Sequence, residues 1–384
     1  MPLADKVYLG KRILKEKGMA GLFKDRFNYE SLHKLALEIQ AVYSGFPIDE
    51  FLNSTMDESW DDLEFKQRVM RIGENLGKYL PSDYKTAIQV IDKVIMNYDI
   101  CLDGFVIFFP AFVELYGHGE ENWDVSMSAL ARYTQYASAE FAVRSFIISD
   151  EERMMAQMAS WAKHDNEHIR RLASEGCRPR LPWGQALPKF YKDPSPVLCI
   201  LEQLKADPSP YVRKSVANNL NDISKTHPDL VVKISKDWYG KDEKTDWIVK
   251  HGCRTLLKNG NRDVLGIFGF TDSNCVKVDG FSLESSFVSV GGRITFTFEI
   301  EALKAAKVRL EYGIDYVKAK GKRNRKIFQI SELTFKEKGK KFYTKTHSFA
   351  DTSTRKHYPG IHSVTLIMNG VEQGTLDFEV LAAE

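Results

Sequence analysis

The sequence is poor in the features of secreted and membrane proteins. Its five cysteines are an odd, widely scattered set without a C-x-x-C pair, which argues against a disulfide framework and a zinc knuckle. The longest apolar run, from Gly104 to Val113, contains Pro110 and is about half of the length that spans a bilayer. The N-terminus alternates charged and apolar residues, so we expect neither a signal peptide nor a membrane anchor. These absences favour a reducing cytoplasm.

Several nucleotide and nucleophile motifs are also missing. The sequence has no G-x-x-x-x-G-K-[ST] loop, no dinucleotide-binding glycine fingerprint and no G-x-S-x-G elbow. Nucleotide hydrolysis, dinucleotide redox chemistry and serine hydrolysis are therefore disfavoured. With 43% hydrophobic, 28% charged and 12% aromatic residues, the composition is that of an ordinary folded chain. At 384 residues it predicts two or three domains.

The small net charge conceals a strong asymmetry. Residues 304–356 contain 16 Lys or Arg against 5 Asp or Glu, a local charge of +11 within a chain of +2, which leaves −9 for the remainder. Such a segment predicts contacts with the phosphates of a polyanion, which weaken as salt rises. The alternative is a solvated lysine-rich surface.

The spacing of the apolar residues changes once along the chain. Up to about Phe268 they recur at helical spacing in segments separated by short Pro, Gly, Asp or Ser breaks. Beyond this point they alternate, as in Ile294 to Ile300, and an Asn369-Gly370 pair signals a hairpin. About seven short strands in roughly 110 residues are typical of an immunoglobulin-like sandwich. The sequence thus predicts an all-α region, residues 1–270, followed by an all-β sandwich, residues 271–384.

Three segments of the helical region can be aligned with one another. They are HIRRLASEG from His168, YVRKSVANNL from Tyr211 and WIVKHGCRTL from Trp247. Ile169, Val212 and Ile248 correspond at intervals of 43 and 36 residues, near the length of HEAT or armadillo units. Stacked repeats of this kind predict a solenoid with a concave groove. Protein, peptide or duplex nucleic acid could occupy such a groove, so the fold alone does not decide the function.

Opposite the apolar stripe, each repeat helix predicts a solvent-facing row at i to i+4 spacing. The rows are Arg171 and Glu175 in the first segment, Lys214, Asn218 and Asp222 in the second, and Lys250, Arg254 and Lys258 in the third. The basic residues suit a DNA backbone, whereas Glu175 and Asp222 would repel phosphates. One reason for carboxylates there is a developing positive charge, such as the oxocarbenium-like sugar formed when a glycosidic bond breaks.

Each of these acidic residues also has a purely structural interpretation. Glu175 can form an i, i+4 ion pair with Arg171, worth about 0.2 to 0.5 kcal/mol. Glu140, in ASAEFAVRSF, is expected in a first helical turn, where the helix dipole favours a carboxylate. Arg213 is expected to bind neighbouring loops.

Trp183 is expected on a loop between helices, because it follows a helix end and two prolines in GCRPRLPWGQ. A bulky indole there either fills a core or contacts a ligand. The neighbouring Arg178 and Arg180 favour a ligand.

A possible metal motif lies just before this region. His164 to His168 match the H-x-x-E-H pattern of inverted zinc peptidases. However, Asp165 and Asn166 resemble a helix N-cap, which places His164 in the preceding loop and away from the helix of His168. We therefore expect no metal at this motif.

Three long strings carry a resemblance to a known family. WAKHDNEHIRRLASEGCRPRLPW at 161–183, DPSPYVRKSVANNLNDISKTHPDL at 207–230 and WIVKHGCRTLLKNG at 247–260 resemble the AlkC branch of the HEAT-like alkylpurine DNA glycosylases. The resemblance covers essentially the whole helical region. Members of this branch can carry a C-terminal immunoglobulin-like domain, in agreement with the strand pattern.

The resemblance implies excision of N3-alkylated bases, chiefly 3-methyladenine and also 3-methylcytosine, from double-stranded DNA without base flipping. It implies that Glu140, Glu175 and Asp222 lie near the scissile nucleotide, that Trp183 packs against it and that Arg171 neighbours them. A monomer without cofactor is expected, with DNA contacts from the basic sandwich domain.

Two other functions remain open from the sequence. A non-catalytic HEAT scaffold that binds DNA or a protein partner would explain the repeats and the basic residues, but not the carboxylates and the loop tryptophan. A metal-dependent hydrolase would use His164 and His168. The helices before about residue 120 are expected to serve as the polar cap of the solenoid.

Overall fold

The structure is a computed structural model that describes residues 23–97, 106–270, 275–319, 321–352 and 355–382. The N-terminal segment, Cys101 and part of the expected domain boundary lie outside these residues. Within them, no helix is both long enough and apolar enough to cross a membrane. The chain forms two compact units, which meet in the sequence between Thr226 and His227.

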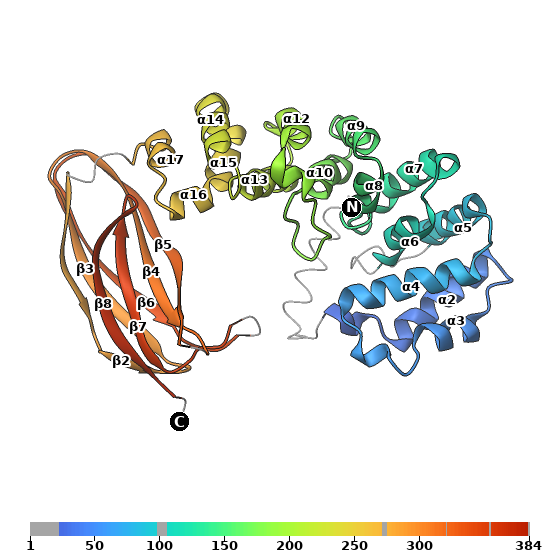
Figure 1. Cartoon of the computed structure of the whole chain (residues 1–384), viewed down its shortest axis with the longest axis horizontal. Helices are drawn as coiled ribbons and strands as arrows, with labels where there is room; N and C mark the ends of the chain where they lie inside the picture. Colours follow the sequence, from blue (N-terminus) through green and yellow to red (C-terminus); the bar gives the residue numbers. More distant parts are fainter. Residues whose placement is uncertain (1–22, 98–105, 271–274, 320, 353–354, 383–384) are drawn as a thin grey trace. The chain divides into compact units, whose positions relative to one another are not determined.

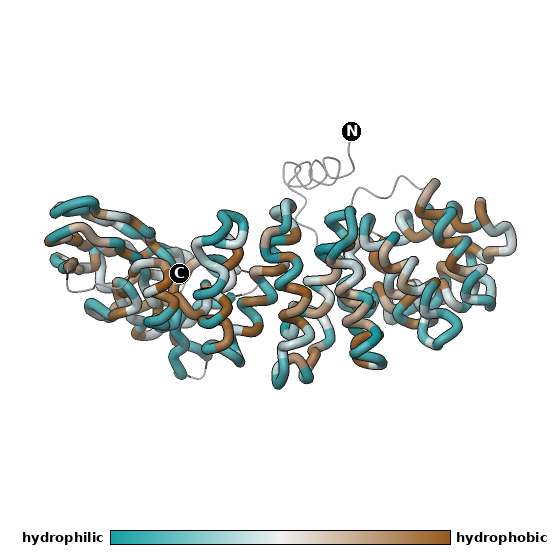
Figure 2. Tube along the Cα trace, turned by 90° about the horizontal axis from the view of Figure 1, so that it is seen from above, coloured by the Kyte–Doolittle hydropathy of each residue, from teal (hydrophilic) through white to brown (hydrophobic). Residues whose placement is uncertain are grey.

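The first unit consists of helices that follow one another in series (Figure 1). Its α-helices are α2 (Tyr29–Val42), α3 (Ile48–Thr55), α4 (Phe65–Tyr79), α5 (Tyr84–Asn97), α6 (Phe108–Tyr116), α7 (Trp123–Tyr133), α8 (Val143–Ser149), α9 (Glu151–Trp161), α10 (Glu167–Gly176), α11 (Lys189–Lys192), α12 (Ser195–Leu204) and α13 (Pro210–Ile223). Short 3₁₀ helices are η1 (Phe23–Arg26), η2 (Trp60–Asp62) and η4 (Glu120–Asn122). Hydrophobic and hydrophilic stretches follow one another along many of the helices (Figure 2), as expected for helices that bury one face.

The sequence signals for helix starts operate as expected at the repeat helices. At α10 the side chain of Asn166 accepts a hydrogen bond from the amide of His168, and at α13 Ser209 accepts one from the amide of Tyr211, with Pro210 as the first helical residue. The inward positions of α13 are fully buried, from Val212 through Val216 and Leu220 to Ile223. The predicted repeat helices are therefore confirmed for the first two segments. The third segment is divided between two helices, Glu243–Gly252 and Arg254–Lys258, so Lys250 does not share a helix with Arg254 and Lys258 as predicted.

The second unit begins with four more helices and continues as a β-sandwich. The helices are α14 (Pro228–Trp238), α15 (Glu243–Gly252), α16 (Arg254–Lys258) and α17 (Arg262–Ile267). The strands are β1 (Val276–Leu283), β2 (Phe287–Ser289), β3 (Arg293–Ala302), β4 (Ala306–Val317), β5 (Arg323–Phe335), β6 (Gly339–Ser348), β7 (Gly360–Met368) and β8 (Val371–Leu381). They form a three-stranded sheet, β1-β3-β6, and a five-stranded sheet, β2-β8-β7-β4-β5. All pairings are antiparallel except that of β2 with β8.

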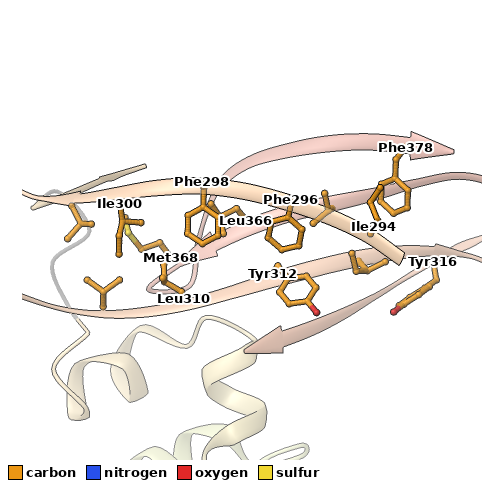
Figure 3. Close-up of a cluster of buried hydrophobic side chains, with 14 of the residues drawn as sticks. Ile294, Phe296, Phe298, Ile300, Leu310, Tyr312, Tyr316, Leu366, Met368 and Phe378 are labelled. Atoms are coloured by element: carbon orange, nitrogen blue, oxygen red, sulfur yellow. The ribbon is translucent and has the colours of Figure 1, made fainter. Parts of the chain in front are cut away.

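The core of the sandwich lies between the two sheets. On β3 the alternating residues Ile294, Phe296, Phe298 and Ile300 are at most 1% exposed, and they face the corresponding row of β4, which includes Leu310 and Tyr312 (Figure 3). Burying a side chain of this size contributes about 1.5–3 kcal/mol. The alternation of apolar and polar residues in the sequence therefore reflects a strand that turns one face toward the core.

The last helices of the second unit pack directly on its sandwich. The turn between α16 and α17 meets the β7–β8 hairpin, whose turn residues Asn369 and Gly370 have φ of 48° and 76°. A Cβ added to Gly370 would lie 2.8 Å from Gly260 Cα and 2.8 Å from Leu265 Cδ1. Lys250 of α15 also forms an ion pair with Glu332 of β5. Glycines at both contact points therefore permit the close approach of helix turn and hairpin.

The predicted fold class is confirmed. The described residues contain helices up to Ile267 and strands from Val276 on, and the Asn369-Gly370 pair forms the predicted hairpin turn. The compact units divide earlier than this change of secondary structure, because α14 to α17 pack with the sandwich. Cys177, Cys199 and Cys253 are free thiols.

Candidate active site

Three carboxylates from different parts of the first unit lie close together. Glu175 is in the last turn of α10, Asp222 is in the last turn of α13, and Glu140 is in the turn before α8. Arg178, in the loop after α10, links two of them. Its Nη1 donates to Glu175 Oε1 at 2.6 Å, and its Nε donates to Asp222 Oδ2 at 2.9 Å. The side chains of Glu175, Arg178 and Asp222 are all buried.

Arg171 extends the cluster to the third carboxylate. Its Nη1 donates to Glu140 Oε2 and, at 2.6 Å, to Ser138 Oγ, while Nη2 is 3.6 Å from Glu175 Oε1. Ser138 in turn donates to Glu140 Oε2 at 2.7 Å. The guanidinium carbon of Arg171 lies 5.1 Å from the centre of the Tyr211 ring, within cation–π range. One guanidinium thus connects residues from three separate segments.

Positive and negative groups alternate through the cluster. In order they are Glu140, Arg171, Glu175, Arg178, Asp222 and Lys225, whose Nζ lies 3.1 Å from Asp222 Oδ1. Burial alone would lower the pKa of the Arg178 guanidinium, but its two carboxylate partners outweigh burial and raise that pKa. Because an unpaired buried charge costs several kcal/mol, this alternation is what allows three carboxylates to be held together.

The close packing of α10 against its neighbours positions these groups. On one side, a Cβ added to Gly176 would lie only 2.5 Å from Val143 Cγ2 of α8, so glycine permits the approach of the two helices. On the other side, Asn219 Nδ2 of α13 donates to the backbone oxygen of Ser174 at 2.9 Å. Ser215 Oγ also donates to Ser174 Oγ at 3.0 Å. These contacts fix the register that places Glu175 beside Asp222.

Trp183 lies at the tip of the loop that follows Arg178. The amide of Gly184 donates to the carbonyl of Leu181 at 3.1 Å, which closes a four-residue turn. Trp183 occupies the third position with φ of 63°, a conformation that favours glycine and costs a tryptophan about 1–3 kcal/mol. Its side chain is 68% exposed, with the Phe65 ring centroid 6.1 Å away. The expected loop position is confirmed, and the indole is not part of a core.

Arg144 of α8 holds the base of the same loop. It is fully buried, and its Nη1 donates to the carbonyls of Gly176 at 2.8 Å and Arg178 at 2.9 Å, while Nε donates to the carbonyl of Gln185. Burial lowers the pKa of this guanidinium to about 10. The two ends of the loop are therefore tied to one buried side chain.

Several positional predictions for the acidic cluster were wrong. Glu175 and Asp222 do not face solvent: they are 5% and 2% exposed, and both accept hydrogen bonds from the buried Arg178. Arg178 itself is paired inside the protein rather than directed outward beside Trp183. Glu140 lies before the first turn of α8, where Ser138 and Arg171 bind its carboxylate in place of the helix dipole.

The remaining predicted residues have mixed surroundings. Lys214 and Lys258 are exposed, and Asn218 is half-buried. Lys250 forms an ion pair with Glu332, and Arg254 Nη1 donates to the carbonyl of His251 at 2.7 Å. The Arg180 guanidinium lies 4.2 Å from the centre of the Tyr191 ring. Arg213 binds the carbonyls of Asp207 and Pro208, so its predicted structural role is confirmed.

The H-x-x-E-H motif has the geometry that the capping argument predicts. Asn166 caps α10, and His164 lies before the helix, where its Nδ1 accepts a hydrogen bond from the amide of Asn166 at 2.9 Å. His168 instead packs edge-on against Tyr211. Among the described residues, no group of three His, Cys, Asp or Glu side chains is arranged to hold a metal ion.

Sequence reasoning missed five residues of the site. One is Lys225, which pairs with Asp222. Tyr211 could have been found, because it occupies the aromatic position shared with His168 and Trp247 in the repeat alignment. Ser138 lies two residues before Glu140. Arg144 and Lys66, whose Nζ donates to the carbonyl of Trp183 at 2.9 Å, bind backbone carbonyls far along the chain, for which the sequence carries no signal.

These features define a class: a helical-repeat protein with an immunoglobulin-like domain and a buried carboxylate–guanidinium cluster where successive repeats meet. Residues 122–256 match the model of the DNA alkylation repair enzyme family, and residues 277–382 match that of the YhaZ C-terminal Ig-like domain. The uncharacterized protein YhaZ of Bacillus subtilis is 44% identical over 93% of this chain and 99% of its own length. Alkylpurine DNA glycosylase AlkC of Pseudomonas fluorescens, solved bound to DNA containing an abasic site analog, superimposes with a TM-score of 0.89. It is 36% identical, with 94% of this chain and 99% of that chain covered.

The chain belongs to the DNA alkylation repair enzyme family, in the group that carries a YhaZ-type C-terminal Ig-like domain. The resemblance to the AlkC branch that the sequence strings suggested is thereby confirmed.

Proposed function

We propose that this protein is a DNA glycosylase that releases cationic N3-alkylated bases, 3-methyladenine and 3-methylcytosine, from double-stranded DNA without flipping the base. Its family and its similarity to AlkC over nearly the whole chain support this activity. The AlkC structure contains an analog of an abasic site, which is the product that remains once a glycosylase has removed a base.

The chemistry of the substrate limits what the protein must supply. An N3-alkylated adenine is already cationic and leaves as a neutral base, so no acid has to protonate it. The remaining tasks are to stabilise the positive charge that develops on the deoxyribose and to position a water molecule at C1′. Carboxylates suit both tasks, and the first unit holds three of them in one cluster.

Within this cluster the carboxylates and the arginines have separate roles. Glu140 and Glu175 supply the negative field at the sugar, which acts through space and needs no direct contact. Asp222 orients the water, which must reach a carboxylate that is 2% exposed in the free protein and paired with Arg178 and Lys225. Arg171 and Arg178 hold the three carboxylates in fixed positions before substrate arrives, so little reorganisation is needed during the reaction. Ser138 supports Glu140 by hydrogen bonding to the same carboxylate oxygen as Arg171 does.

The DNA contacts are proposed from the sequence and from the exposure of Trp183, Lys214 and Lys258. Trp183 presents an exposed indole for packing against the damaged nucleotide. The proposed DNA-contacting residues are Trp183, Arg180, Lys214, Asn218, Lys250, Arg254 and Lys258, with Arg171 and Arg178 inside the acidic cluster. The basic segment at 304–356 adds further phosphate contacts from the sandwich.

One observation carries the proposal: three carboxylates are held beside one another by buried arginines in a chain that belongs to a DNA alkylation repair family. The test is to incubate the purified protein with duplex DNA treated with a methylating agent. Chromatography of the released bases should show 3-methyladenine and 3-methylcytosine, with an equal number of abasic sites in the DNA. Binding to this DNA without any base release would instead identify a non-catalytic scaffold.

A further inference from the structure

Trp183 is tied to a helix that lies far from it in the sequence. Lys66, in the first turn of α4, donates from Nζ to the backbone carbonyl of Trp183 at 2.9 Å. The same ammonium lies 4.9 Å from the centre of the Phe141 ring, and Phe141 directly follows Glu140. The neighbouring Phe65 places its ring 6.1 Å from the indole at an interplanar angle of 47°. Helix α4 therefore contacts both Trp183 and the segment that carries Glu140.

The strained backbone of Trp183 requires a stabilising contact. Its φ of 63° is one that a tryptophan adopts only where surrounding contacts enforce it. Arg144 fixes the base of the loop through the carbonyls of Gly176, Arg178 and Gln185, but none of these contacts reaches the tip. Lys66 supplies the side-chain hydrogen bond that does so.

A small cleft continues from this tie toward the acidic cluster. Its lining includes Phe65, Lys66, Ser138 and Phe141. Ser138 is the residue that hydrogen-bonds Glu140 and Arg171. The side chain of Lys66 thus lies between the tryptophan loop on one side and the support of Glu140 on the other.

We propose that Lys66 is a positioning residue for Trp183: its ammonium holds the strained turn so that the indole is presented at a fixed place beside the acidic cluster. Helix α4 is then part of the lesion-contacting apparatus and not only an end cap of the helical array. The effect of Lys66 on DNA binding rests on the proposed function, whereas its effect on the position of Trp183 concerns the free protein.

The structural part can be measured without DNA. The full-length protein is labelled with 5-fluorotryptophan, and the Trp183 signal is assigned as the ¹⁹F resonance that Trp183→Phe removes. In Lys66→Met, which keeps the aliphatic stem and loses the donor, the Trp183 resonance should shift or split while the other tryptophan signals stay in place. Lys66→Arg, which keeps a donor, should remain close to wild type. Lys78→Met on the same helix, where Nζ lies over the Tyr79 ring, is the matched control and should change nothing.

The functional part uses a duplex with a tetrahydrofuran abasic site as the probe. Lys66→Met should weaken binding about tenfold, and the double variant Lys66→Met/Trp183→Ala should bind no more weakly than Trp183→Ala alone, since both changes remove the same contact. Additive losses, together with a salt dependence that becomes shallower by about one, would mean that Lys66 contacts a phosphate itself and would overturn the proposal.

Failure of the positioning role and failure of the proposed function give different experimental results. An unchanged Trp183 resonance in Lys66→Met overturns the positioning role, whatever the enzyme does. A wild-type protein that releases no methylated base refutes the proposed function, whereas the fluorine spectra still decide whether Lys66 holds the turn.

Discussion

Glu175 and Asp222, from the ends of two helices in successive repeats, share a single guanidinium, that of Arg178. The shared partner fixes the spacing of the two carboxylates to within the reach of one planar group. It also couples them, because a change at one carboxylate alters the charge balance around the other. Their arrangement therefore depends on how α13 packs against α10 and not on either helix alone.

Glu175→Gln tests the proposed field at the sugar. The substitution keeps the shape of the side chain but replaces one acceptor oxygen with an NH₂ donor and removes the negative charge, so single-turnover release of 3-methyladenine should fall by about 10² or more. Binding to abasic-site DNA should survive. Glu202→Gln on α12, where the exposed carboxylate forms an ion pair with Lys205, is the control. Near-normal turnover by Glu175→Gln would remove this residue from the mechanism.

Arg178→Met tests the buried bridge itself. It leaves the carboxylates of Glu175 and Asp222 buried without their shared partner, so we expect the free energy of unfolding to fall by about 3–5 kcal/mol. Arg153→Met removes a surface ion pair with Glu120 and should cost only about 0–1 kcal/mol. Urea unfolding of the two variants and wild type provides the comparison. Equal losses for the two substitutions would contradict the bridging role.

The architecture could be predicted from the sequence because it depends on local patterns. Helical spacing, caps such as Ser209 and Asn166, and the alternation on β3 are each contained in a few consecutive residues. The Asn369-Gly370 turn belongs to the same kind of signal. The packing of α14 to α17 on the sandwich could not be predicted, because it depends on Gly260 meeting Gly370, a contact between positions far apart in the sequence.

The members of the acidic cluster other than Lys225 could be named from the sequence, but their burial could not. Helical periodicity assigns Asp222 to an outer face, and this would hold for an isolated helix. In the protein, Arg178 lies in the loop after α10, and its pairing with Asp222 offsets part of the cost of burying that carboxylate. Lys66 and Arg144 escaped prediction for the same reason, since each binds a carbonyl that any residue type would provide.

Gly370→Ala tests the contact between hairpin and helix turn in the second unit. The new Cβ would meet Gly260 Cα and Leu265 Cδ1, each at 2.8 Å, in addition to the cost of φ at 76°. Gly240→Ala is a matched control, since Gly240 has a similar φ of 85° and nothing within 4 Å of an added Cβ. Gly370→Ala should therefore lower the melting temperature by clearly more than Gly240→Ala. Equal decreases in melting temperature would mean that the surrounding atoms accommodate the new Cβ without loss of stability.

His347 predicts how the stability of the sandwich depends on pH. Its ring lies between two hydroxyls, with Nδ1 2.9 Å from Tyr312 Oη and Nε2 2.7 Å from Tyr316 Oη. Burial, followed by the positive charges of Arg355, His357 and Lys345, lowers the pKa of His347 to about 4.

The unfolded chain, whose histidines titrate near 6.5, therefore binds a proton between about pH 6.5 and 4 that the folded sandwich does not. Stability should fall as the pH drops through this window, with a contribution from this group of up to about 1.4 kcal/mol per pH unit, and should not change above it on this account. His347→Leu should be less stable than wild type at pH 7 but should lose less on going to pH 5. Urea unfolding at both pH values, with the exposed His164→Gln as control, measures the difference.

An identical pH dependence in wild type and His347→Leu would show that the buried imidazole does not control acid stability. It would direct attention to His118, His168 and His362, whose pKa values burial also lowers.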